Sequence, residues 1–143
     1  MHRPIAAGIA YVVLTFAIAF TWHLVLFKSL YDELAIFTRA QPIIPLGIAS
    51  IVLQAVIIVF MYSRWPKSGS AARDGLRFGL LIGALMATIA VLAEAGKQNV
   101  TSLGTWLILE SVYYLLQFGM VGMVIGLIFA GRKGGEAIRP RSA

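Results

Sequence analysis

Residues 106–129 decide the fold, and they read WLILESVYYLLQFGMVGMVIGLIF. This stretch is apolar almost throughout and exceeds the ~20 residues that a helix needs to cross a bilayer. Three similar stretches precede it, at about residues 5–27, 43–62 and 76–95. Backbone polar groups in lipid must bond within their own segment, so each stretch is predicted to be helical. The sequence therefore predicts one all-α integral membrane domain over residues 1–143, with four antiparallel transmembrane helices in a single bundle.

The composition supports a membrane protein and excludes several other classes. Hydrophobic residues make up 59% of the chain and the mean hydropathy is +0.86, which is high for a soluble domain of 143 residues. The chain has no cysteine, which excludes disulfides and thiolate metal sites. The formal net charge is +6, but the basic residues flank the apolar stretches. This placement predicts contact with membrane lipids rather than with nucleic acid.

The distribution of basic residues predicts the orientation. Nine of the 12 Lys and Arg side chains belong to the N-terminal tail, the second loop and the C-terminal tail, and three belong to the other side. The positive-inside rule then places both termini in the cytoplasm. The first span has an alternative interpretation as a cleaved secretory signal ending at Ala17-Ile18-Ala19. Its apolar run continues to Phe27, and this full spanning length favours a retained helix.

The connecting segments predict three further features. The pattern of apolar residues between Leu30 and Arg39 predicts a short helix at the outer membrane interface, with Ser29 and Asp32 as its capping pattern. The alternative is that this segment simply extends the first span. The short loop from Gly96 to Gly104 predicts a tight hairpin between spans three and four. Residues 131–143 are basic and rich in glycine, and we expect them to be a disordered tail.

Small residues recur every four positions on the last two spans. Such spacing clears one helix face, so that two backbones approach closely. We expect the two stripes to pack against each other within the hairpin; the alternative is that one of them faces a second copy of the protein. The predicted packing residues are Gly75, Gly79, Gly83, Gly122 and Gly126.

Several polar side chains fall within or near the predicted spans, and they form the candidate polar pocket or proton site. Ionisable groups at membrane depth are costly and are candidates for function. A purely structural interpretation pairs Glu94 with Lys97, and Glu110 with His23 or Lys28. The candidate residues are His23, Gln54, Glu94, Glu110 and Gln117.

No catalytic or cofactor motif is found. Haem held by two histidines needs a second histidine within the membrane, and zinc needs three or four ligands where only His23 is well placed. The chain has no G-x-S-x-G, H-E-x-x-H or P-loop motif. We therefore predict a protein that is not an enzyme and that needs no cofactor or metal.

Three stretches resemble a known group: Trp22–Tyr31 (WHLVLFKSLY), Gly75–Gly83 (GLRFGLLIG) and Tyr114–Ile128 (YLLQFGMVGMVIGLI). With four spans in this length, the chain resembles a family of small four-span bacterial membrane proteins catalogued as a domain of unknown function. The resemblance implies a bacterial inner membrane, an outer interfacial segment and a glycine-rich final hairpin. One departure is Trp22-His23, where the family pattern would have Trp-Tyr. The family has no established catalytic residues, so the resemblance implies no activity.

Two functional hypotheses follow. The first is a non-catalytic binding or accessory bundle that engages a lipid, a small apolar ligand or a partner membrane subunit. The second is a small proton-coupled transporter that works as a homo-oligomer and uses Glu110 or Glu94 as its proton site.

Overall fold

The computed structural model describes residues 2–36, 39, 41 and 43–131, and all the regular structure in them is helical. Four helices are long and apolar enough to cross a membrane. They are α1 (His2–Phe20) with its continuation η1 (Thr21–Leu26), α3 (Ile44–Ser63), α4 (Ala71–Ala87) with its continuation η2 (Thr88–Ala93), and α5 (Leu103–Ala130). The four predicted apolar helices are therefore confirmed. The predicted tail at 132–143 lies outside the described residues.

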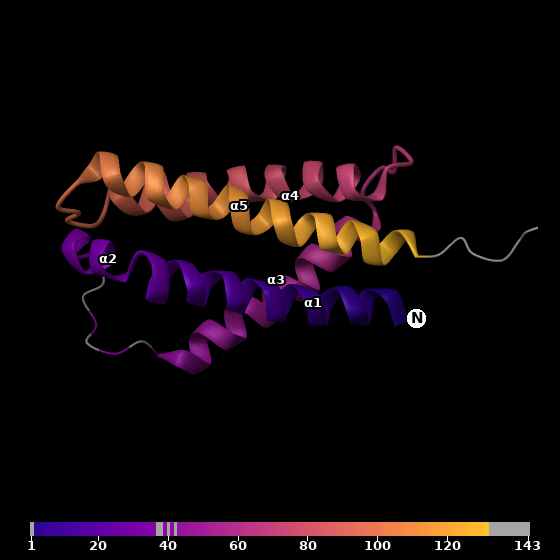
Figure 1. The fold of residues 1–143 in the computed structure, drawn as a ribbon, viewed down its shortest axis with the longest axis horizontal. Helices are drawn as coiled ribbons and strands as arrows, with labels where there is room; N and C mark the ends of the chain where they lie inside the picture. Colours follow the sequence, from indigo (N-terminus) through magenta and orange to yellow (C-terminus); the bar gives the residue numbers. More distant parts are fainter. Residues whose placement is uncertain (1, 37–38, 40, 42, 132–143) are drawn as a thin grey trace, which may run out of the picture.

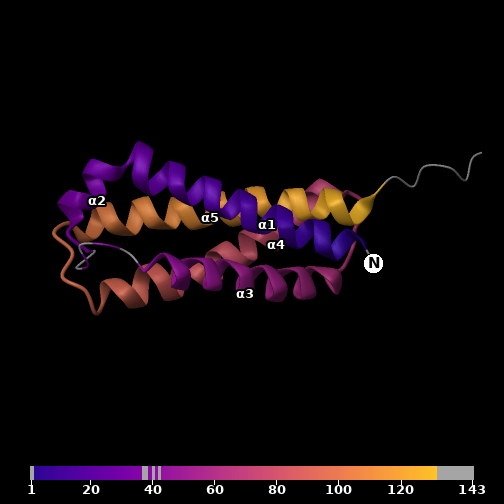
Figure 2. The same cartoon turned by 90° about the horizontal axis from the view of Figure 1, so that it is seen from below.

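The helix ends and the loops lie at two opposite poles of the molecule (Figure 1). One pole, called here the N-terminal end, holds the start of α1, the 64–70 loop and the end of α5. The opposite pole, called the α2 end, holds the short helix α2 (Lys28–Leu34) and the start of α5. Figure 2 shows α3 running between these poles, and its main contact is with α1.

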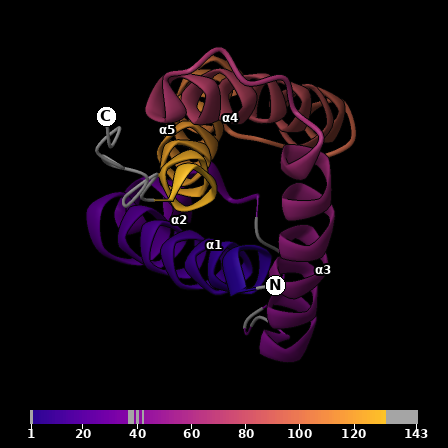
Figure 3. The ribbon, with the colours of Figure 1, turned by 90° about the vertical axis from the view of Figure 1, so that its right-hand side faces the viewer.

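α5 is the central helix of the fold. It makes its most extensive contact with α4 and a second contact with α1, whereas α3 packs mainly on α1. Viewed from the N-terminal end, α5 lies between α1 and α4, with α3 to one side (Figure 3). A first apolar cluster, which includes Tyr11, Tyr62, Phe78 and Ile125, joins these four helices, and a second one, around Leu34, Val91 and Trp106, lies at the α2 end.

α4 begins at Ala71 rather than at the predicted position 76. Asp74 is buried in its first turns and accepts hydrogen bonds from the backbone N–H of Ser68, at 2.8 Å, and from the Ser68 hydroxyl. A carboxylate is stabilised near a helix N-terminus by the backbone N–H groups and the helix dipole. Asp74 therefore stabilises the first turns of α4, and the helix includes residues from Ala71 onward that are polar in the sequence.

The short helix after the first span is present, but its predicted limits and cap are wrong. It covers Lys28–Leu34 rather than 30–39, and it ends because Ala35 adopts a left-handed conformation with φ 54°. Its N-cap position is held by Phe27, without a side-chain cap, and Asp32 instead pairs with Lys28 at 2.6 Å. Phe27, with φ −120°, separates α2 from η1, so the segment does not simply extend the first span. Residues 37 and 38 of the predicted helix lie outside the described residues.

Two long helices change to π-helix over their last turns. Next to each change a side chain bonds to a carbonyl of the preceding turn: His23 Nδ1 to Ala19, at 3.0 Å, and Thr88 Oγ1 to Leu85, at 2.7 Å. Such bonds compete with the regular backbone ladder. π-Helical turns re-aim side chains and are frequent at functional sites. One of these segments, η1, carries Trp22 and His23.

Candidate functional site

Glu110 is the centre of a polar cluster at the α2 end of the molecule. It lies in the second turn of α5 and is only 3% exposed. An isolated carboxylate in such surroundings would be strongly destabilising, so it needs partners from other elements. The structure supplies these partners from η1 and α2.

Two side chains contact the same carboxylate oxygen. The Tyr31 hydroxyl of α2 donates a hydrogen bond to Glu110 Oε1, and His23 Nε2 of η1 lies 3.4 Å from that oxygen. Trp22 Nε1 in turn donates to the Tyr31 hydroxyl at 3.1 Å. The cluster therefore links η1, α2 and α5 through a continuous polar chain. We call Trp22, His23, Tyr31 and Glu110 the Glu110 cluster.

The hydrogen bonds determine where a proton must lie in this cluster. The Ala19 carbonyl can only accept, so His23 Nδ1 carries a proton and donates it at 3.0 Å. His23 Nε2 then faces Glu110 Oε1 at 3.4 Å, the same carboxylate oxygen that accepts the hydrogen bond from Tyr31.

Aromatic rings surround the histidine. The His23 ring lies between those of Tyr31 and Tyr113, with centroids 4.6 Å and 4.5 Å away, and Trp22 packs on Tyr113 at 5.8 Å. These ring contacts help to hold His23 beside Glu110. The four side chains of the cluster do not line the apolar groove described below.

The five candidate polar residues do not form one pocket. His23 and Glu110 meet, but Glu94 lies in the turn after η2, where Lys97 Nζ is 3.6 Å from it and Gln98 donates to it at 2.9 Å. Lys28 pairs with Asp32 instead of Glu110. Glu94 with Lys97 and Glu110 with His23 are the pairs that the structural interpretation of the sequence expects.

Gln54 belongs to a second polar contact. It accepts a hydrogen bond from Tyr11 of α1 at 2.8 Å and donates to Ser50, one turn earlier on α3, at 2.9 Å. This contact joins α1 to α3 and leaves Gln54 apart from the Glu110 cluster. Gln117 is buried on α5, two turns beyond Glu110 on the same face.

Tyr31 and Trp22 are the members of the cluster that the polar pattern did not single out. Both carry one polar atom on a large apolar ring, so they look like core or interfacial residues in a sequence. The available signal was their position: Trp22 is adjacent to His23, and Tyr31 lies on the apolar face of the short helix. A buried acid needs donors, and aromatic donors at the same end of the bundle are its natural partners.

The glycine residues of α4 lie directly against α5. A Cβ added at Gly75 would overlap the carbonyl oxygen of Gly122, and one at Gly79 would overlap that of Phe118. At Gly83 it would lie 2.8 Å from the Tyr114 carbonyl oxygen. Increasing residue numbers along α4 meet decreasing residue numbers along α5, so these two helices run antiparallel. The small-residue stripes thus face each other within the hairpin.

A Cβ at Gly126, near the end of α5, would overlap the Ala71 carbonyl oxygen in the same way. The close approach therefore continues to the N-terminal end of the hairpin.

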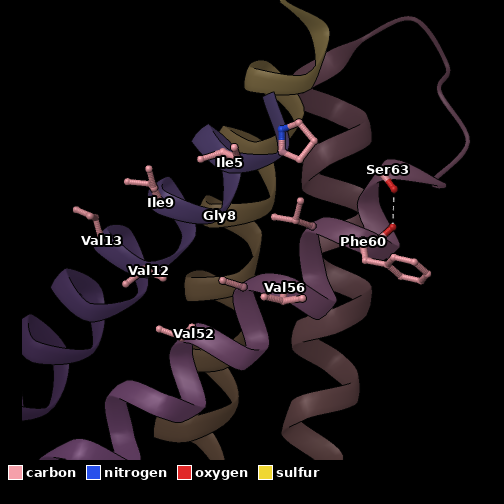
Figure 4. Close-up of a pocket in the computed structure, with 12 residues that line it drawn as sticks. Ile5, Gly8, Ile9, Val12, Val13, Val52, Val56, Phe60 and Ser63 are labelled. Carbon is pink, nitrogen blue, oxygen red and sulfur yellow. Dashed lines mark hydrogen bonds between the residues drawn. The ribbon is translucent and has the colours of Figure 1, made fainter. Parts of the chain in front are cut away.

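An open apolar groove lies between α1 and α3 at the N-terminal end. Its volume is about 680 Å³. Figure 4 shows the α1 residues along one side and the α3 residues along the other. The α1 side includes Ile5, Gly8, Ile9, Val12 and Val13, and the α3 side includes Val52, Val56, Phe60 and Ser63.

Within the part of the chain that the structure describes, no three His, Asp or Glu side chains lie close enough together to hold a metal ion. The contacts within the Glu110 cluster are hydrogen bonds and the approach of His23 to the carboxylate. The groove, in contrast, offers apolar contact.

Comparison of this chain with family models, curated proteins and solved structures finds no match. The interpretation therefore rests on the geometry of the cluster, the hairpin and the groove.

Proposed function

We propose that the protein is a multi-pass protein of the bacterial inner membrane with both termini in the cytoplasm. The four long helices cross the bilayer as one antiparallel bundle, and α2 lies at the outer interface. Their length and hydropathy support this arrangement, as does the basic loop that follows α3. The resemblance to small four-span bacterial membrane proteins supports the choice of membrane.

Within that membrane, the protein is a non-catalytic binding or accessory bundle that holds an apolar chain in the groove between α1 and α3. The groove itself carries this proposal. Its volume of about 680 Å³ falls in the range of ligand sites, and apolar side chains from two helices line most of it. Among the described residues, the polar groups of the Glu110 cluster at the α2 end contact one another.

Filling the groove tests this function. A Cβ at Gly8 meets no atom within 4 Å, so Gly8→Leu places a side chain in the groove without displacing the fold. Gly47 is equally open but does not line the groove, which makes Gly47→Leu the matched control. Native mass spectrometry of the protein released from detergent should show bound lipid for the wild type and for Gly47→Leu. Gly8→Leu should lose it. Equal lipid retention in all three proteins would contradict the proposal.

A second candidate function is proton-coupled transport by an oligomer. The observation that favours it is the contact between the partly buried His23 and the buried Glu110, whose Nε2 and Oε1 atoms lie 3.4 Å apart. Proteoliposomes loaded with a pH-sensitive dye test it, with Glu110→Gln as the variant and Glu94→Gln as the control. A proton flux that disappears only in Glu110→Gln would replace the accessory function by transport. We expect no flux above empty vesicles for any of these proteins.

A further inference from the structure

One end of the α1–α3 groove carries a guanidinium group. Arg64 follows the last residue of α3, and its Cζ lies 3.6 Å from the centroid of the Phe60 ring. Its Nη1 donates to the Phe60 carbonyl and to Ser63 Oγ, both at 3.1 Å. Phe60 and Ser63 both line the groove. Arg64 is therefore held at the groove's rim by two of the residues that form it.

Two other cations at this end of the molecule contact residues that do not line the groove. Arg3 donates to the Phe129 carbonyl at the end of α5, at 2.9 Å. Lys67 donates to the Tyr62 carbonyl at 2.8 Å and lies over the Tyr62 ring. The ion pairs found among the described residues do not include Arg64. Arg64 is thus an exposed positive charge at the rim of an apolar groove.

The length of the groove matches one leaflet of a bilayer. Its α3 side runs from Val52 to Ser63, which corresponds to roughly 16 Å at the rise of an α-helix. Half of a hydrocarbon core of ~30 Å is about the same length. An acyl chain lying along the groove would therefore place its headgroup beside Arg64, at the level of the membrane surface.

We infer that the groove binds a phospholipid with an anionic headgroup, its acyl chain between α1 and α3 and its phosphate on Arg64. This inference rests on the proposed function and specifies its ligand. Guanidinium groups form paired hydrogen bonds with phosphate oxygens, and basic sites between transmembrane helices bind anionic lipid headgroups. Apolar contact with the acyl chain and charge contact with the headgroup thus act at adjacent positions of one site.

The test compares two lipids of equal chain length by native mass spectrometry in detergent: phosphatidylglycerol, which is anionic, and phosphatidylcholine, which is zwitterionic. The variants are Arg64→Gln and Arg73→Gln, an equal charge change at an exposed residue of α4 that does not line the groove. We expect the wild type and Arg73→Gln to prefer phosphatidylglycerol. Arg64→Gln should weaken phosphatidylglycerol binding about fivefold, the effect of one basic side chain near an anionic surface. It should weaken phosphatidylcholine binding less, because the choline cation of that lipid offsets the charge of the phosphate that both lipids carry.

The outcomes separate the inference from the proposed function. If both lipids bind equally well, and Arg64→Gln changes neither, the groove binds acyl chains without headgroup selection and this inference is wrong. If Arg73→Gln has the same effect as Arg64→Gln, the preference comes from general surface charge, and the inference is also wrong. If the wild type binds no lipid, the proposed function fails as well. If the protein is a dimer and Gly8→Leu disrupts the dimer, a second copy of the chain occupies the groove, and the lipid inference is wrong.

Discussion

Glu110 shows how a membrane helix can carry a buried acid. Tyr31 donates to its carboxylate, and His23 Nε2 lies 3.4 Å from the same oxygen, so the group has partners from two other elements. Removing one partner of such a pair leaves the other buried without compensation. The cluster therefore ties α2 and the end of the first long helix to α5, whatever ligand the protein binds.

Replacing Glu110 should weaken the α2 end of the fold. Glu110→Gln keeps the shape of the side chain but replaces the carboxylate that faces His23 and Tyr31 with an amide. The free energy of unfolding should fall by about 1 kcal/mol, the scale of polar contacts between membrane helices. Thermal unfolding in detergent measures this change. Glu94→Gln, in the half-exposed turn, is the control and should unfold like the wild type.

Tyr31 predicts a dependence of stability on alkaline pH. Its burial, together with the hydrogen bond to Glu110 and the charge of that carboxylate, raises the pKa of the Tyr31 hydroxyl above its usual value. The unfolded chain therefore loses this proton first as the pH rises. The contribution of Tyr31 to the free energy of unfolding is fully present below about pH 10, the ordinary pKa of tyrosine, and declines above that pH.

The variant Tyr31→Phe isolates this contribution from those of the other tyrosines. The difference in unfolding free energy between the wild type and Tyr31→Phe should shrink between about pH 9 and pH 11. Chemical unfolding in detergent at several pH values, followed by tryptophan fluorescence, measures it. A difference that stays constant or grows over this range would contradict the prediction.

At the scale of elements, the α4–α5 hairpin is held by close backbone approach. Gly75, Gly79 and Gly83 leave room for carbonyl groups of α5 where any Cβ would collide. Without a hydrophobic driving force between helices in lipid, such packing is a main source of helix association. The hairpin is thus the most rigidly specified part of the fold.

A single methyl group at this contact should be costly. Gly79→Ala would place a Cβ on the Phe118 carbonyl oxygen, and the helices would have to separate. We expect a loss of roughly 1–3 kcal/mol in stability, the usual cost of overpacking. Gly47→Ala meets open space and should be neutral or slightly stabilising, because alanine favours the helix. Thermal unfolding of both variants in detergent makes the comparison, and equal midpoints would show that the stripe is not tightly packed.

At the scale of the whole molecule, burial is uneven. In the most apolar window of each helix, 44% of α5 is buried inside the structure but only 17% of α3 and 11% of the first long helix. The exposed faces of α1 and α3 are apolar, with Ile9, Val13 and Val56 each more than half exposed. In the proposed bilayer these faces meet lipid, and the groove between them is the place where a lipid can be held.

The proposed orientation predicts the side of each loop. A reporter inserted at Ser68-Gly69 should give a cytoplasmic signal. The 64–70 loop and its flanks are rich in basic residues, and such loops stay on the cytoplasmic side of the membrane. A reporter inserted at Asn99, in the turn between η2 and α5, should read periplasmic. Alkaline phosphatase and green fluorescent protein insertions give opposite signals on the two sides. The reverse pattern would overturn the orientation.

Some of these features follow from the amino-acid sequence without any structure. The four helices were predictable because long apolar segments satisfy their backbone groups in lipid only as helices. The small residues every four positions on α4 and α5 predicted a contact face, because that spacing places them on one side of a helix. These are local properties of consecutive residues.

Other features depend on how distant segments meet, and only the tertiary structure shows them. The sequence allows either His23 or Lys28 as the partner of Glu110. It gives no sign of the contact with Tyr31, which is 79 positions away. The positions of His23 and Tyr31 beside α5 depend on the π-helical end of the first helix and on the turn at Phe27. The groove likewise exists because α1 and α3 touch through Tyr11 and Gln54 yet stay apart beside Gly8. Apolar periodicity specifies a helix but not its rotation or crossing angle, since lipid accepts almost any apolar face.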